Sequence, residues 1–68
     1  MKYEIILYWS ENDNVYIAEV PELSGCMADG PMAAEALRNV ELIAQAWIET
    51  ARELERPVPE PKGRLKYA

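Results

Sequence analysis

The sequence predicts an α+β fold: a small antiparallel sheet with one long helix packed on one of its faces. Residues 2–9 and 15–20 follow the period of two that is typical of β-strands. Residues 31–55 instead repeat apolar side chains at spacings of three and four, the period of an amphipathic helix. Because 68 residues supply only one small core, we expect a single domain over residues 1–68 in which the sheet receives the helix.

The first two strands are expected at residues 2–9 and 15–20, joined by a turn at residues 10–14. The turn segment is rich in Asn, Asp and Ser, which tolerate turn conformations. One register produces a wholly apolar face for the helix, and it has three pairs: Trp9 with Tyr16, Leu7 with Ala18, and Ile5 with Val20. The same register leaves Ile6, Tyr8 and Ile17 on the opposite face, beside Glu4 and Glu19.

A short third strand is expected at residues 26–28, after a change of chain direction. Pro21 cannot donate to a strand ladder, and Gly25 supplies a backbone conformation that other residues resist. The residues Asp29 and Gly30 then lead the chain into the helix. The predicted order is therefore strand, strand, strand, helix.

The helix is expected to run from Pro31 to about Glu55, with Pro31 in its first turn. Pro57 disfavours helical geometry at the residue before it, so the helix ends near residues 54–56. The predicted buried stripe consists of Ala33, Leu37, Val40, Ala44, Trp47, Ala51 and Leu54.

The chain after the helix has two parts. Prolines at 57, 59 and 61 predict an extended segment. Residues Arg64 to Tyr67 alternate again, and they form either a last edge strand or a solvated tail.

Composition limits the classes of function. The net charge of −5 argues against direct binding of nucleic acid and favours a basic protein partner. The chain has no histidine and a single cysteine, so it has no intramolecular disulfide framework and lacks the commonest metal ligand. No signal peptide or membrane span precedes the first strand, and we expect a cytoplasmic protein.

The face opposite the helix is the candidate binding surface. A cluster of Ile6, Tyr8 and Ile17 is more apolar surface than a small monomer should leave in water, although isolated apolar residues are normal on any surface. We expect a homo-oligomer (dimer or tetramer) or a partner protein to cover it. The candidate interface residues are Ile6, Tyr8, Ile17, Glu19, Glu22 and Leu23. Ile43 and Ile48 widen the helix stripe, which again points to a second subunit.

Several short motifs occur in a characteristic order along the chain. They are Val-Pro-Glu-Leu-Ser-Gly-Cys at 20–26, Asp-Gly at 29–30, Glu-Ala-Leu-Arg-Asn at 35–39, Ala-Trp-Ile at 46–48 and Pro-Val-Pro-Glu-Pro at 57–61. In order and spacing they resemble the HicB-like antitoxin family, of the UPF0150 type, over nearly the whole chain. No single motif is specific, but the set is.

The resemblance implies both a fold and a function. The family's N-terminal domain is described as a partial ribonuclease-H-like fold, and it binds and masks a small basic ribonuclease toxin, HicA. The chain departs from the family at Ser24, where proline is usual, and at residues 31–34, which supply no hydroxyl to cap the helix, so Asp29 or Gly30 is expected to cap it. Many members also carry a C-terminal DNA-binding domain, which these residues do not include, so the resemblance does not extend to autorepression.

Catalytic chemistry finds little support in the sequence. A metal-dependent nuclease on a ribonuclease-H-like scaffold needs converging carboxylates, whereas the acids here are predicted on the turn, the outward face and the helix. Cys26 has no histidine to activate it and is expected to be a small buried hydrophobe. Trp9 and Trp47 are expected to pack in the core rather than stack on RNA. We expect no catalytic residue, metal or cofactor, and an orphan oligomeric scaffold without a toxin remains the alternative.

Overall fold

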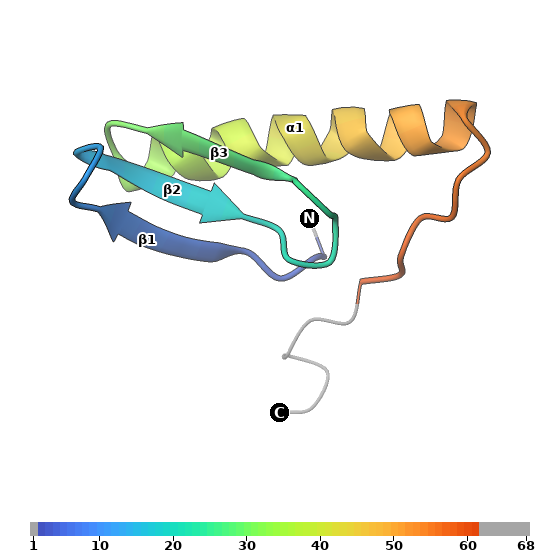
Figure 1. Cartoon of the computed structure of the whole chain (residues 1–68), viewed down its shortest axis with the longest axis horizontal. Helices are drawn as coiled ribbons and strands as arrows, with labels where there is room; N and C mark the ends of the chain where they lie inside the picture. Colours follow the sequence, from blue (N-terminus) through green and yellow to red (C-terminus); the bar gives the residue numbers. More distant parts are fainter. Residues whose placement is uncertain (1, 62–68) are drawn as a thin grey trace.

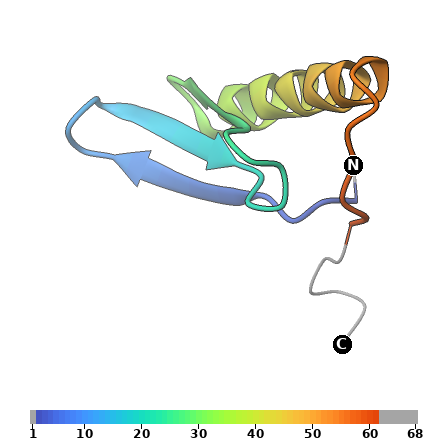
Figure 2. The same cartoon turned by 45° about the vertical axis from the view of Figure 1, so that its right-hand side comes forward.

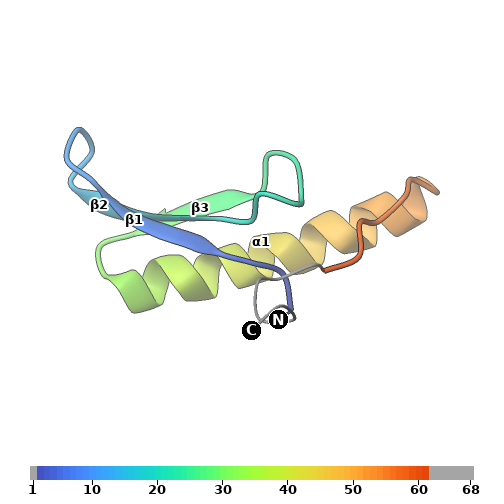
Figure 3. The same ribbon diagram turned by 90° about the horizontal axis from the view of Figure 1, so that it is seen from below.

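A computed structural model describes residues 2–61. It contains the strands β1 (Ile6–Ser10), β2 (Val15–Glu19) and β3 (Met27–Gly30), followed by the helix α1 (Ala33–Glu53). The strands form one antiparallel sheet in the order β1-β2-β3, and α1 lies across one of its faces (Figures 1 and 3). The predicted α+β class is confirmed. The expected strand at residues 64–67 lies outside the described residues.

The hairpin has the predicted register. Trp9 lies opposite Tyr16 and Leu7 lies opposite Ala18. The Trp9 and Tyr16 rings meet edge to face, with their centroids 5.0 Å apart. The turn closes at Asn14, whose φ of 53° is left-handed, a conformation that asparagine tolerates better than most residues.

Side-chain size decreases across the helix-facing side of the sheet. One row of cross-strand neighbours runs Leu7, Ala18, Ala28, and the next runs Trp9, Tyr16, Gly30. The small residues on β3 let α1 approach the sheet closely, so α1 packs mainly over β3 and β2. The large residues of β1 therefore lie beside the helix rather than beneath it. The expectation that Trp9 packs in the core is wrong, because 45% of its side chain is exposed.

The buried side of α1 differs from the predicted stripe. Ala36, Val40, Ala44 and Ala51 are its buried residues, and Trp47 packs against the core they form. Two members of the predicted stripe are wrong, because 38% of Leu37 and 55% of Leu54 are exposed. Close packing on β3 requires small side chains at the centre of the interface, which turns the helix toward Ala36 and moves Leu37 to its flank.

The ends of α1 also differ in detail from the expectation. Met32, in an extended conformation, is the N-cap residue, and its side chain makes no capping hydrogen bond. Pro31 therefore precedes the cap rather than sitting in the first turn, and neither Asp29 nor Gly30 caps the helix. At the C-terminal end Glu55 adopts a φ of 55°, and the Arg56 amide donates to the Ala51 carbonyl, as in a Schellman motif.

The connection between β2 and β3 completes the core. Gly25 has a φ of 76°, as its predicted role requires. Leu23 and Cys26 are buried, and the Val20 amide donates to the Cys26 carbonyl at 2.9 Å. The indole Nε1 of Trp47 donates to the Ser24 carbonyl at 2.9 Å, which joins α1 to this turn.

The segment after α1 returns toward the start of the chain (Figure 2). The Tyr3 hydroxyl donates to the Pro59 carbonyl. This hydrogen bond places the extended segment beside the residues that precede β1.

Candidate functional site

The sheet face turned away from α1 carries two rows of side chains. Pairing of the strands aligns Tyr8, Ile17 and Asp29 in one row and Ile6, Glu19 and Met27 in the next. Side chains alternate between the faces of a sheet, so all six point away from the helix. We call these six residues the outward face.

The outward face combines accessible apolar surface with negative charge. Ile6, Tyr8 and Met27 are exposed, and Ile17 at the centre is half-buried. Glu19 and Asp29 lie among them, and the three strands contain neither Lys nor Arg. A surface of this kind suits a partner that presents apolar side chains surrounded by positive charge.

Four of the six candidate interface residues lie together on this face: Ile6, Tyr8, Ile17 and Glu19. Glu22 is half-buried in the turn between β2 and β3, beyond the end of the sheet. The expectation for Leu23 is wrong: its side chain is fully buried in the core and belongs to no accessible surface. Leu23 is enclosed because the 21–25 turn folds over the hydrophobic core, where its amide donates to the Val20 carbonyl.

Met27 and Asp29 are members of the outward face that the sequence did not indicate. Their side is fixed by the β2–β3 register, in which Glu19 opposes Met27 and Ile17 opposes Asp29. A buried Cys26 would have implied an outward Met27, since neighbouring residues of a strand point to opposite faces. The short third strand offered too few residues for that alternation to be recognised.

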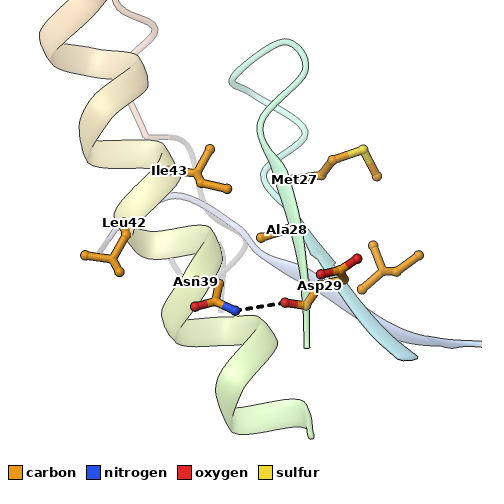
Figure 4. A pocket seen from close by; sticks show the side chains of 7 residues that line it. Met27, Ala28, Asp29, Asn39, Leu42 and Ile43 are labelled. Carbon is orange, nitrogen blue, oxygen red and sulfur yellow. Dashed lines mark hydrogen bonds between the residues drawn. The ribbon is translucent and has the colours of Figure 1, made fainter. Parts of the chain in front are cut away.

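A shallow apolar hollow lies at the edge of β3, next to α1 (Figure 4). Ile43 points from the helix toward the strand, and Met27 and Ala28 line the other side. The Asn39 side-chain amide donates to the Asp29 carbonyl at 2.9 Å. This bond occupies a carbonyl that would otherwise be available at the sheet edge.

Reactive groups are sparse in the described part of the chain. Cys26 is a free, buried thiol, and burial raises its pKa, which opposes formation of the nucleophilic thiolate. Across residues 2–61, no three acids, cysteines or histidines are grouped closely enough to hold a metal ion. In the same range, no helix is long and apolar enough to span a bilayer.

Comparison with known proteins identifies similar chains. A UPF0150 protein of the cyanobacterium Synechocystis is 32% identical over 65 residues, covering 96% of this chain and 88% of its own length. A UPF0150 protein of Thermoplasma acidophilum is 36% identical over 59 residues, covering 87% of this chain and 84% of its own. No family model matches the chain. No solved structure matches it either.

Proposed function

The chain belongs to the UPF0150 family, and from that premise we propose that it is a HicB-like antitoxin-type protein that binds and masks a small basic ribonuclease toxin of the HicA type. The proposal joins the motif resemblance in residues 20–61 to the character of the outward face. Its role is protein binding, without catalysis or a cofactor. The outward face is the surface assigned to the partner.

The arrangement of the outward face is the observation that carries this proposal. Its apolar residues form one continuous group over three strands, so a partner can displace water from all of them at once. Ile17 sits at the centre, between Tyr8 and Asp29. Central, fully desolvated contacts dominate the free energy of binding at most protein interfaces.

Electrostatics supports a basic partner over an acidic or neutral one. The chain carries a net charge of −5, and the outward face contributes two carboxylates without a compensating cation among the strands. Opposite charges accelerate the encounter of two proteins and orient them before contact. A small basic ribonuclease has the complementary charge, since it binds RNA phosphates through Lys and Arg.

The function is tested with a purified small basic ribonuclease of the HicA type, and a reading frame next to the gene for this chain is the first place to search for it. Ile17→Lys places a positive charge at the centre of the outward face and removes the apolar contact, while Asp29 lies opposite and can accommodate the ammonium group. We expect Ile17→Lys to weaken binding at least about tenfold, because truncated or mismatched central contacts commonly cost more than 1 kcal/mol. Calorimetric titration measures the affinity, and an RNA cleavage assay measures masking.

Leu54→Lys is the matched control. Leu54 follows α1 and is 55% exposed, and it belongs neither to the outward face nor to the hollow at the edge of β3, so the same charge is added away from the proposed binding surface. This variant should bind and mask like the wild type. Equal losses in both variants, or a wild-type chain that binds no small basic ribonuclease of the HicA type, would contradict the proposed function. Circular dichroism confirms that each variant retains its fold.

A further inference from the structure

β1 is exposed on both of its faces. Residues 5–9 are five consecutive apolar residues, a pattern typical of strands that are buried on both sides within a sheet. Among residues 2–61, however, β1 is an edge strand. Exposed fractions are similar on the two sides, at 40% and 41% for Ile6 and Tyr8 and at 42% and 45% for Leu7 and Trp9.

The hydrogen-bonding groups at this edge can be assigned from the opposite side of the sheet. The Asp29 carbonyl accepts a bond from Asn39 of α1, so it points away from β2. Neighbouring residues of an antiparallel strand direct their peptide groups to alternate sides. The backbone groups of Ala28 and Ala18 therefore form hydrogen bonds with each other, and those of Ile17 form hydrogen bonds with those of Tyr8. The peptide groups of Leu7 then point outward from the sheet.

The same alternation applies along β1, so Leu7 and Trp9 present their N–H and C=O groups to an edge that no other strand of residues 2–61 occupies. No charged residue lies between Ile5 and Ser10. Natural edge strands are usually protected by charges, prolines, bulges or a covering segment. β1 contains no charged residue and no proline. The helix α1 does not cover β1, because it lies mainly over β2 and β3.

The edge of β3 has a different character. It is one residue shorter, it carries Asp29, and Asn39 already occupies one of its outward carbonyls. These features discourage addition of another strand. Of the two edges of the described sheet, β1 is the one suited to pairing.

We propose that β1 pairs with β1 of a second copy of this chain, antiparallel, about a two-fold axis that passes through Leu7. In this register Leu7 opposes Leu7 of the second copy, and Ile5 opposes its Trp9. The outward peptide groups of Leu7 and Trp9 then gain partners, and Ile5 extends the pairing by one residue beyond β1. The two sheets join into one, and the side chains of Leu7 and Trp9 from both copies fill the space between the two helices.

Charge and symmetry favour a second copy despite the net charge of −5. Continuing the register outward sets Glu4 against Ser10 and Tyr3 against Glu11 of the second copy, so no like charges are opposed. A register shifted to centre on Tyr8 would oppose the apolar Ile5 to the charged Glu11. A two-fold interface uses the same patch on both copies, and β1 is self-complementary in this sense.

The inference goes beyond the proposed function and is independent of it. Dimerisation through β1 leaves the outward face of each copy free, and it places the two faces side by side on one continuous sheet. Binding of a partner is measured by the Ile17→Lys variant, whereas pairing of β1 is measured by molecular mass without any partner. Failure of either proposal is thus distinguishable from failure of the other.

Charge exchange at Leu7 tests the two-fold axis. Leu7→Glu opposes two carboxylates across the axis, and Leu7→Lys opposes two ammonium groups, so we expect each variant alone to be a monomer. An equimolar mixture should form a heterodimer, because Glu and Lys then face each other. Light scattering on the full chain should give the mass of two chains for the wild type and for the mixture, and the mass of one chain for each variant.

The matched controls are Leu42→Glu and Leu42→Lys, which add the same charges on the far flank of α1 and should leave the dimer intact. Far-ultraviolet circular dichroism verifies folding of each variant. A monomeric wild type, single Leu7 variants that still dimerise, or a mixture that stays monomeric would overturn the proposal. A monomer whose Leu7 amide nevertheless resists hydrogen exchange would assign the edge to a segment of the same chain instead.

Discussion

Gly30 is a residue at which the sheet and the helix approach closely. A Cβ atom at this position would lie 2.7 Å from the Ala36 backbone nitrogen and 3.0 Å from the Glu35 Cβ. Both neighbours belong to α1, so a side chain at residue 30 would push the helix away from the sheet. The absence of a side chain at Gly30 is therefore a packing requirement.

We expect Gly30→Ala to lower the free energy of unfolding by about 1–3 kcal/mol, the usual cost of overpacking. Gly25→Ala is the control, since its Cβ would meet no atom within 4 Å and its cost arises only from the left-handed backbone, about 1–2 kcal/mol. Urea denaturation measures both. Amide chemical shifts of α1 should move in Gly30→Ala and stay in place in Gly25→Ala; unchanged stability of Gly30→Ala would refute the close packing.

The thiol of Cys26 makes the free energy of unfolding depend on pH in the alkaline range. Burial raises the pKa of its thiol above the ordinary value near 9.0, so the unfolded chain loses this proton at a lower pH than the folded chain does. The contribution of Cys26 to the free energy of unfolding is fully present below the pKa of the unfolded chain. This contribution is lost as the pH rises through the pKa of the folded chain. We expect wild-type stability to fall more steeply above pH 9 than that of Cys26→Ala, as measured by urea denaturation across the alkaline range. Parallel curves would show that the thiol does not contribute.

At the scale of the element, α1 shows what periodicity can and cannot predict. Spacings of three and four located the helix within about two residues at each end, because Ala, Leu and Glu also favour helix locally. The rotation of the helix about its axis was not predictable in the same way. Leu37 and Leu54 are the larger hydrophobes, but contact with Gly30 selects the small Ala36 for the interface.

The N-terminus of α1 can be stabilised by a single substitution. Met32 occupies the N-cap position without a side-chain bond, and Glu35 stands three residues later. Met32→Ser completes the Ser-x-x-Glu capping box, and we expect a gain of about 1 kcal/mol in the free energy of unfolding. Met32→Ala serves as the control for loss of the exposed methionine, and a thermal melt compares the two. Equal melting temperatures would contradict the assigned cap.

The strands were predictable to different degrees. The β1–β2 register followed from the alternation of large apolar residues, because slipping by one residue would turn Leu7 and Trp9 away from the helix. The β3 register depended on four residues and a preceding turn, so Met27 and Asp29 could not be placed on the outward face. Leu23 was misplaced because a leucine in a turn looks accessible until the fold of that turn is known.

At the scale of the whole molecule, the sheet has two different surfaces. One side packs on α1 through residues that decrease in size from β1 to β3, and the other side exposes apolar residues beside two carboxylates. The helix alone therefore covers only part of the apolar surface of the sheet. In our account the remaining surface is divided between a protein partner on the outward face and a second copy at the edge of β1.

The central claim of this account is that the outward face is a protein-binding surface. Methyl resonances test it most directly when the full chain is titrated with a small basic ribonuclease of the HicA type. We predict that the methyl signals of Ile6, Ile17 and Met27 shift, while those of the buried Leu23 and Val40 stay in place. Shifts confined to Leu42 and Ile43 on the flank of α1, or no shifts at all, would contradict it.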